Sequence, residues 1–132
     1  VKGWRVLLQV CYDLRFPVWA RQQINSETAA PEYDLIVYVA NWPQRRSHAW
    51  KTLLCARAIE NQSYVIGVNR VGSDGHQVYH SGDSLIIDPM GEVLYHMPDR
   101  EDVFTITLEK SMLEETRQKL PFLKDADSFR IL

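Results

Sequence analysis

Three short apolar runs in the first half of the chain share one pattern. They cover residues 6–10, 35–39 and 64–68, are rich in β-branched residues, and do not alternate strictly between apolar and polar positions. Runs of this kind are typical of strands buried on both faces, as in a parallel sheet covered by helices. We therefore expect three parallel strands in this part of the chain.

Helical patterns lie between these runs. Pro17 suits the first turn of a helix that continues to Gln23. A longer helix is predicted from Ser47, which can act as its N-cap, to Glu60, with Asn61 as a left-handed residue at its C-terminal end. One face of this helix is apolar and carries Trp50, Leu53, Leu54 and Ala58. The predicted order is β-α-β-α-β.

The second half of the chain predicts a hairpin, a further strand and a last helix. The apolar segment 84–87 is followed by the turn sequence Asp-Pro-Met-Gly at 88–91 and a return strand at 92–96. Residues 103–108 alternate, which indicates a strand with one less buried face. A capping box at 111–114 would open the last helix, which Pro121 ends.

Composition narrows the class of protein. The chain has 132 residues, of which 45% are hydrophobic and 24% charged, as in a globular domain with a core. A net charge of −2 gives no electrostatic argument for binding nucleic acid or an anionic membrane. No apolar run approaches the roughly 20 residues that span a bilayer. We expect neither a nucleic-acid nor a membrane partner.

Polar side chains follow each of the three predicted parallel strands. They are Cys11, Asn41 and the pair Asn69-Arg70. Sites form at the carboxyl ends of parallel strands, so these side chains should share one edge. A cysteine at a strand-to-helix turn exposes its thiol and places backbone N–H groups near a developing oxyanion, and a thiolate attacks acyl carbons. On pattern alone, however, a cysteine after an apolar strand is more often an inert buried residue.

The second cysteine, Cys55, lies in the middle of the long predicted helix and is interpreted as structural. Both cysteines lie in apolar segments of a cysteine-poor chain, unlike a disulfide framework. We expect both to be thiols in a reducing compartment, and hence a cytoplasmic protein. The four histidines, His48, His76, His80 and His96, are too dispersed for a metal-ligand motif, so neither a metal nor another cofactor is expected.

The segment Cys-Tyr-Asp-Leu-Arg-Phe-Pro at 11–17 resembles the nucleophile motif of the nitrilase superfamily of carbon–nitrogen hydrolases. Further blocks resemble this family in the family's order, at residues 40–43, 56–61, 69–72, 81–84 and 88–91. Together they cover most of residues 4–96. Within the family, the chain is most similar to the omega-amidase-like branch, which hydrolyses the terminal amide of short dicarboxylic acid monoamides such as alpha-ketoglutaramate.

This resemblance implies a Glu-Lys-Cys triad in which Cys11 is the nucleophile that forms a thioester. The backbone N–H of Tyr12 would stabilise the oxyanion, and Asn41 and Trp42 would contact the substrate. Structural support is implied for Arg15, Arg57, Glu60 and Asn61. Sister activities of the same family, such as carbamoylase, nitrilase or acyltransfer, stay open, as does a non-catalytic interaction module.

The chain also departs from the family pattern. The family's catalytic Glu and Lys lie upstream of the nucleophile, but only ten residues precede Cys11 and they contain no Glu, while Lys2 is not in the family's lysine motif. Val18 replaces a Glu that many relatives carry outside the triad. We therefore expect residues 1–132 to be the C-terminal half of a C–N hydrolase domain with a four-layer α-β-β-α sandwich fold, and expect the isolated chain to be inactive.

Half of such a sandwich would leave a sheet edge and apolar surface uncovered. We therefore expect the chain to pair with the missing N-terminal half or with another copy, and to act on a small-molecule amide. Relatives often dimerise through helices, which suggests Trp50 and Leu54 as interface residues.

Overall fold

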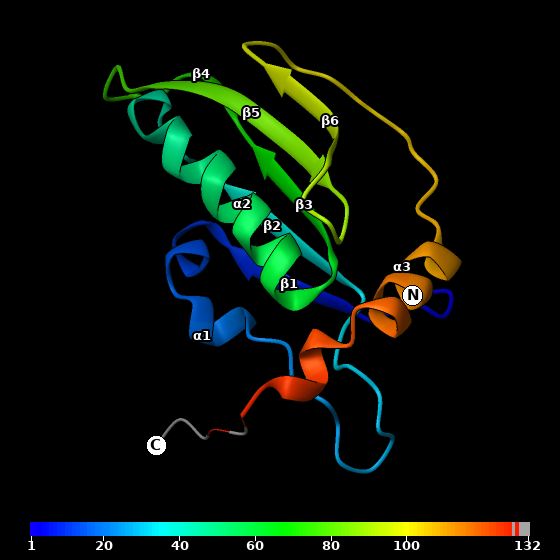
Figure 1. Cartoon of the computed structure of the whole chain (residues 1–132). Coiled ribbons are helices and arrows are strands. Elements are labelled where there is room, and N and C mark those ends of the chain that lie inside the picture. The colour runs from blue at the N-terminus through cyan, green and yellow to red at the C-terminus, as the bar shows by residue number, and fades with distance from the viewer. Residues whose placement is uncertain (128, 130–132) are drawn as a thin grey trace.

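Three parallel strands form one side of a six-stranded sheet in the computed structural model, which describes residues 1–127 and 129 (Figure 1). They are β1 (Val6–Val10), β2 (Leu35–Ala40) and β3 (Tyr64–Asn69). Val10 pairs with Val39, and Val39 with Val68. The carboxyl ends of the three strands therefore lie in register at one edge, which confirms the predicted parallel sheet.

The other side of the sheet is antiparallel. β5 (Tyr79–Ile87) pairs with β3, with the short β4 (Val71–Ser73) and with β6 (Val93–Pro98). The β5–β6 turn closes through a hydrogen bond from the Gly91 N–H to the Asp88 carbonyl oxygen at 3.0 Å. Gly91 has φ 90°, a conformation that favours glycine. The predicted hairpin is therefore confirmed.

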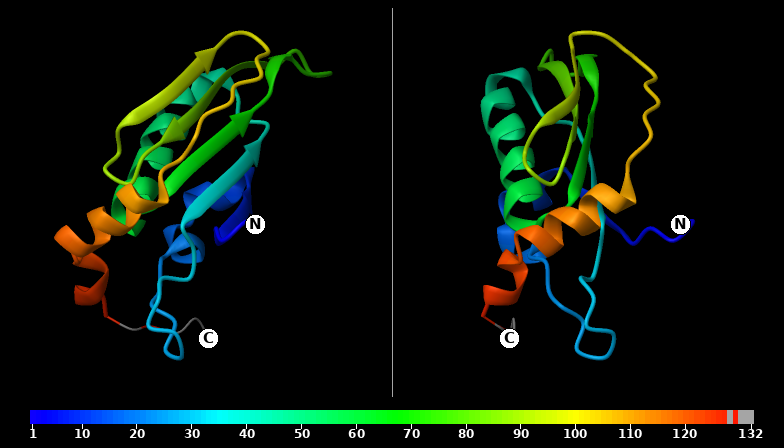
Figure 2. Two further views of the ribbon diagram at one scale, coloured as in Figure 1. Left: turned by 90° about the vertical axis from the view of Figure 1, so that its right-hand side faces the viewer. Right: turned by 45° about the vertical axis from the view of Figure 1, so that its right-hand side comes forward.

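Helices and turns cover one face and one end of this sheet (Figure 2). The long helix α2 runs along one face, whereas the extended segment 99–109 passes on the opposite side. The helices are α1 (Pro17–Ala20), α2 (Ser47–Asn61) and α3 (Lys110–Lys119), and the 3-10 turns are η1 (Cys11–Arg15), η2 (Gln44–Arg46) and η3 (Phe122–Asp125). Among the described residues, none of the helices has the length and apolarity of a membrane-spanning segment.

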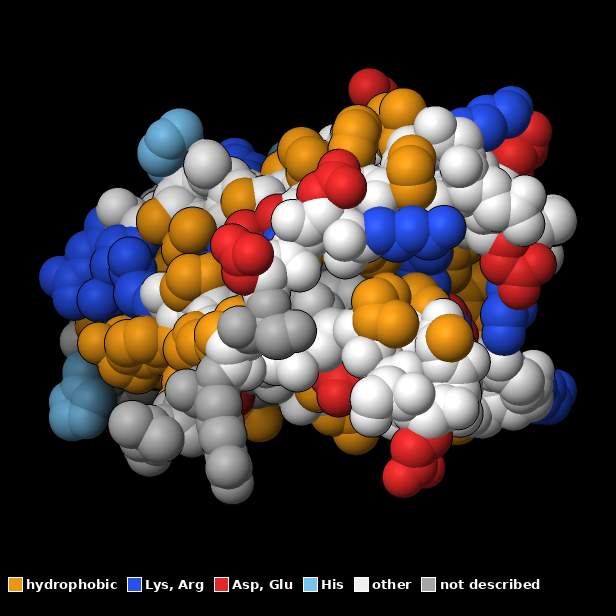
Figure 3. Space-filling view, turned by 60° about the horizontal axis from the view of Figure 1, so that its bottom comes forward, with side chains coloured by type: hydrophobic (Ala, Val, Ile, Leu, Met, Phe, Trp, Pro, Cys, Tyr) orange, Lys and Arg blue, Asp and Glu red, His pale blue; other side chains and the backbone are white. Residues whose placement is uncertain are grey.

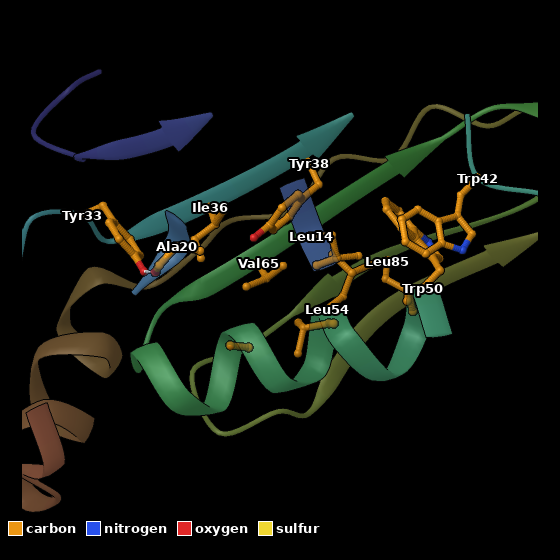
Figure 4. Packing of buried hydrophobic residues seen from close by; sticks show 12 residues of the cluster. Leu14, Ala20, Tyr33, Ile36, Tyr38, Trp42, Trp50, Leu54, Val65 and Leu85 are labelled. Atoms are coloured by element: carbon orange, nitrogen blue, oxygen red, sulfur yellow. Dashed lines mark hydrogen bonds between the residues drawn. The ribbon is translucent and has the colours of Figure 1, made fainter. Parts of the chain in front are cut away.

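The main hydrophobic core lies between α2 and the sheet (Figure 4). Trp50 and Leu54 of α2 are fully buried there. Gly67 of β3 allows this close packing, because a Cβ at residue 67 would lie 2.4 Å from Leu54 Cδ1 and 2.8 Å from Trp50 Cζ2. The prediction that Trp50 and Leu54 contact another subunit is therefore wrong, since both side chains already pack against the chain's own sheet.

The opposite face of the parallel strands is open in this chain. The side chains of Leu8, Val10, Val39 and Val68 are 73%, 61%, 50% and 48% exposed. The alternation of side chains along a strand places them on the face away from α2. The expectation that both faces of these strands are buried is wrong for the described residues, because their helices pack on one face only. We call this surface the open face.

A buried carboxylate joins α3 to the start of the sheet. Asp34 is 1% exposed and accepts hydrogen bonds from Arg5 Nη2 at 2.6 Å, Arg5 Nε at 3.1 Å and Arg117 Nη1 at 3.1 Å. Lys110 Nζ lies 3.6 Å from the same carboxylate. Three cations from two distant parts of the chain therefore converge on one buried acid. At the end of the molecule shown in Figure 3, acidic, basic and apolar side chains are interspersed.

Several predicted helix ends differ from the structure. The first helix ends at Ala20 rather than Gln23, because the next residues are held by other contacts: the Gln22 N–H donates to Asn61 Oδ1 at 2.8 Å. Ser47 is the first residue of α2 and makes no capping hydrogen bond, since the turn η2 leads directly into the helix. The left-handed residue after α2 is Gln62, with φ 44°, and not Asn61.

Residues 103–108 do not form the predicted strand. Ile106 and Leu108 are partly buried and their neighbours are exposed, as the alternation indicates, but no strand among the described residues pairs with this segment. The predicted capping box is also absent, because α3 begins at Lys110 with Glu109 as its N-cap and no side-chain hydrogen bond. The helix ends at Lys119, just before Pro121, as expected.

Candidate active site

The candidate nucleophile lies at a sharp turn at the end of β1. Cys11 is the first residue of η1, is partly buried, and has φ 42°. A non-glycine residue rarely adopts this left-handed conformation, and such strained positions cluster at functional sites. Asp13 holds the turn, because its carboxylate accepts the Val10 N–H at 2.9 Å and its carbonyl accepts the Phe16 N–H at 2.9 Å.

Tyr12 follows Cys11 in the first turn of η1. Backbone N–H groups in the first turn of a helix have no acceptor within the helix, so they are available to an anion. The Tyr12 side chain is exposed and packs edge-on against Phe16, with 5.1 Å between the ring centroids. An oxyanion role for the Tyr12 N–H stays a prediction.

The end of α2 supports the turn that carries Cys11. Arg57 Nη2 donates to the Leu14 carbonyl oxygen at 2.6 Å, and Arg57 Nη1 donates to Glu60 Oε1 at 2.9 Å. Asn61 is fully buried, donates to the Arg57 carbonyl oxygen at 2.9 Å, and accepts the Gln22 N–H. These contacts fix η1 and the segment after α1 on the helix, as a supporting role requires.

Arg15 contacts Trp42 through its guanidinium group. Arg15 is exposed, and its guanidinium carbon lies 4.9 Å from the centroid of a Trp42 ring, which is a cation–π contact. Trp42 itself is only 4% exposed: its ring lies 5.5 Å from that of Trp50, and its Nε1 donates to the Arg46 carbonyl oxygen at 2.8 Å. The indole is packed in the core, and a direct contact of Trp42 with a substrate stays a prediction.

Asn69 holds the loop that carries Asn41 and Trp42. Its side chain accepts the Trp42 N–H at 2.7 Å and donates to the carbonyl oxygens of Trp42 and Gly82 at 3.0 and 2.7 Å. The sequence placed Asn69 at this edge but assigned it no role. The sequence signals were an amide at the end of an apolar strand and its place in the family-like block 69–72, and neither reveals which residues Asn69 contacts in the fold.

A groove of about 640 Å³ runs over the open face beside this edge. Asn41, Asn69 and Arg70 line one end of it, and apolar side chains, among them Val68, Met97 and Phe104, line its length. The charged residues 100–102 (Arg, Glu and Asp) also line the groove. Cys11 does not line the groove but lies next to this end, across β2. Within the described residues, no three His, Cys, Asp or Glu side chains are placed to hold a metal ion.

Comparison with known proteins shows which family and which proteins this chain is similar to. Residues 1–118 match the sequence profile of the carbon–nitrogen hydrolase family. The chain is 52% identical over 132 residues to the omega-amidase YafV of Escherichia coli (strain K12), with 98% of the chain and 48% of that protein covered. It is 36% identical over 116 residues to the 2-oxoglutaramate amidase of Bacillus subtilis (strain 168), with 88% and 42% covered.

A solved structure of a protein from the same superfamily has a similar fold. XC1258 from Xanthomonas campestris, a CN-hydrolase superfamily protein with an arsenic adduct in its active site, superposes with a TM-score of 0.96 at 48% identity. The match covers 99% of this chain and 50% of that one. The chain therefore spans about half the length of the relatives that it matches.

Proposed function

Since the chain belongs to the carbon–nitrogen hydrolase family, we propose that it supplies the nucleophile, Cys11, of an amidase that acts on small carboxylic acid amides. The observation that carries this proposal is the geometry of Cys11. Its thiol sits at a strained turn, at the carboxyl edge of three parallel strands, and α2 holds that turn through Arg57. An inert core cysteine would need none of these features.

The proposed reaction has two steps. The Cys11 thiolate attacks the amide carbonyl carbon, a C–S bond forms, and the C–N bond breaks as the nitrogen takes up a proton and leaves as ammonia. Water then attacks the thioester, and the C–S bond breaks to release the carboxylic acid and restore the thiol. The first turn of η1 offers backbone N–H groups, including that of Tyr12, to the oxyanion of each tetrahedral intermediate.

The groups that move protons are proposed to lie outside this chain. In the family they are a Glu and a Lys upstream of the nucleophile, and no residue before Cys11 matches their motifs. We propose that residues 1–132 form the C-terminal half of the domain, that the open face packs against the N-terminal half, and that the enzyme works in the cytoplasm. The exposed apolar side chains of the open face support such packing.

The proposed substrate is the terminal amide of a short dicarboxylic acid monoamide. This follows the relatives named omega-amidase and 2-oxoglutaramate amidase. Ammonia release from such a monoamide by the intact protein, as expressed from its gene, tests the proposal. No release from this class of amide would overturn the substrate assignment.

Alkylation of the two thiols separates an enzyme from a non-catalytic module. In the intact protein, we expect iodoacetamide to label Cys11 rapidly and stoichiometrically, and Cys55 slowly. Cys55 is partly buried in the middle of α2, and burial raises the pKa of its thiol, which disfavours the reactive thiolate. Peptide mass spectrometry over time gives both rates, with Cys11→Ala and Cys55→Ala as controls. Equal, slow labelling of both residues would argue against a catalytic Cys11.

The isolated 132-residue chain is expected to release no ammonia from the same monoamide. A thiol without its base and oxyanion partner is a poor nucleophile toward amides. The measurement compares this chain with the intact protein at equal concentration, and circular dichroism confirms that the chain is folded. Turnover by the isolated chain at the rate of the intact protein would contradict the proposed division of the site.

A further inference from the structure

We propose that Arg70 binds the free carboxylate of the substrate and thereby selects acidic over neutral amides. This inference rests on the proposed amidase function and adds to it a residue that determines specificity. It starts from a cation at the carboxyl edge of β3 that lines the groove and faces no carboxylate partner within ion-pair distance among the described residues.

The distance from the nucleophile suits a short substrate. Val10, Val39 and Val68 are in register across β1, β2 and β3, and the Arg70 N–H donates to the Ala40 carbonyl oxygen at 3.2 Å. Two interstrand spacings therefore separate the end of β1 from the end of β3, about 10 Å between their backbones. The side chain of an arginine and a short dicarboxylic acid monoamide together can bridge this gap.

The Arg70 guanidinium is available for a ligand. The residue is exposed, and within the described part of the chain its side chain makes one hydrogen bond, from Nη2 to the Ser73 carbonyl oxygen at 3.2 Å. The nearest acid in sequence, Asp74, is engaged elsewhere, because its Oδ1 accepts the backbone N–H groups of His76 and Val78 at 2.8 and 2.9 Å. Its own pKa is lowered chiefly by those backbone hydrogen bonds, with a smaller contribution from Arg70.

The side chains at the carboxyl edge of the strands include hydrogen-bond donors that can bind a carboxylate. A guanidinium presents a planar fork of donors that pairs with both oxygens of a carboxylate. Asn41, exposed at the same end of the groove, offers a further amide donor. By contrast, Arg57 is buried and bound to Leu14 and Glu60, so it cannot serve a ligand without releasing the turn that carries Cys11. Arg15 and Arg100 are also exposed near this edge, but the Arg15 guanidinium lies over the Trp42 ring and Arg100 Nε donates to Met97 Sδ at 3.0 Å. We therefore assign the substrate anion to Arg70.

A carboxylate held at Arg70 is remote from the reacting carbonyl. Such a contact stabilises bound substrate and transition state equally, so its loss raises KM and leaves kcat nearly unchanged. A catalytic defect caused by a distorted Cys11 turn would lower kcat for every amide. We therefore compare KM and kcat for an acidic and a neutral amide. A raised KM for the acidic amide alone indicates a binding role of Arg70, and a lowered kcat for both amides indicates a structural role.

The test uses the intact protein with succinamate and with butyramide, in which a methyl group replaces the carboxylate. We expect Arg70→Gln to raise KM for succinamate about 10- to 100-fold, the usual effect of losing hydrogen bonds between charged groups, with little change in kcat. Activity toward butyramide should not change. Arg70→Lys should recover part of the loss. Arg45→Gln, which removes the same charge from an exposed arginine outside the groove, should have no effect on either amide.

Each outcome decides one of the two claims. Hydrolysis of succinamate with a KM that Arg70→Gln leaves within about twofold, or equal loss toward both amides, would overturn the role of Arg70 and leave the amidase function intact. If the intact protein hydrolyses neither amide, the proposed function fails. In that case the role of Arg70 is tested by asking whether succinate protects Cys11 from iodoacetamide. Protection in the wild type that is lost in Arg70→Gln supports the role of Arg70. Equal protection in both proteins, or none in either, overturns it.

Discussion

Replacing Asp34 by asparagine is expected to lower the free energy of unfolding by about 3–5 kcal/mol, the usual cost of removing one partner from a buried ion pair. Asp34 is buried, and its carboxylate holds Arg5 from the start of β1 and Arg117 from α3. The Arg117 side chain is only 12% exposed, so the substitution leaves a poorly solvated cation without its counter-charge. It also loosens the attachment of α3 to the sheet.

The effect of this substitution should depend on pH. Burial opposes ionisation of Asp34, but the hydrogen bonds from Arg5 outweigh it and hold the pKa of this carboxyl below its ordinary value. A group whose pKa is depressed in the folded state stabilises the fold above its unfolded pKa, which is about 3.9 for aspartate. That stabilisation is lost as the pH falls through the lower folded pKa. The difference between wild type and variant should therefore shrink below about pH 4.

Urea denaturation of the intact protein at several pH values measures both effects. Asp125→Asn, which removes an exposed carboxylate on η3, is the matched control and should change the unfolding free energy by about 0.5 kcal/mol or less. A loss for Asp34→Asn no larger than that of the control, or one that is constant down to pH 2, would show that the ion cluster does not hold α3.

The second large effect is expected at the contact between α2 and β3. Trp50→Ala should cost about 3–5 kcal/mol, because it empties a fully buried site and leaves the Asp83 carbonyl oxygen without the Nε1 donor that lies 2.8 Å away. Gly67→Val should cost about 1–3 kcal/mol on its own, because its Cβ would collide with Leu54 and Trp50.

The two substitutions should compensate in part when combined. Removal of the indole makes room for Leu54 to move and for a side chain at residue 67, so the double variant should lose at least 1 kcal/mol less than the sum of the single losses. Thermal and urea denaturation of the three variants provide the double-mutant cycle. Trp19→Ala, at an exposed tryptophan of α1, controls for loss of an indole at the surface. If the loss of the double variant equals the sum of the two single losses, the absence of a side chain at Gly67 is not what allows α2 to pack closely on the sheet.

Much of the fold could be predicted because the responsible signals are local. The three apolar runs became β1, β2 and β3 within a residue of their predicted ends, and the turn at Asp88–Gly91 followed from its own four residues. The position of the candidate site followed from the same strands. Once they are parallel, Cys11, Asn41 and Arg70 must meet at one edge.

What the sequence did not predict depends on neighbours in space. The helix after Pro17 stops early because Asn61, about 40 residues away, binds the backbone of Gln22. Residues 103–108 have the alternation of a strand but no partner strand among the described residues. The role of Asn69 arises from contacts with Trp42 and Gly82, which no local pattern records. In each case the local sequence is compatible with more than one structure, and contacts with residues distant in sequence determine which one forms.

The backbone at Cys11 has a consequence for protein engineering. With φ 42°, this position favours glycine or asparagine, and any other residue there costs the fold on the order of 1 kcal/mol. A redesign of this backbone that optimises stability alone would therefore favour replacing Cys11, since this left-handed position also carries the proposed nucleophile. Stabilised variants meant to keep activity need residue 11 held fixed and their gains sought elsewhere, for instance on the solvent-facing side of α2.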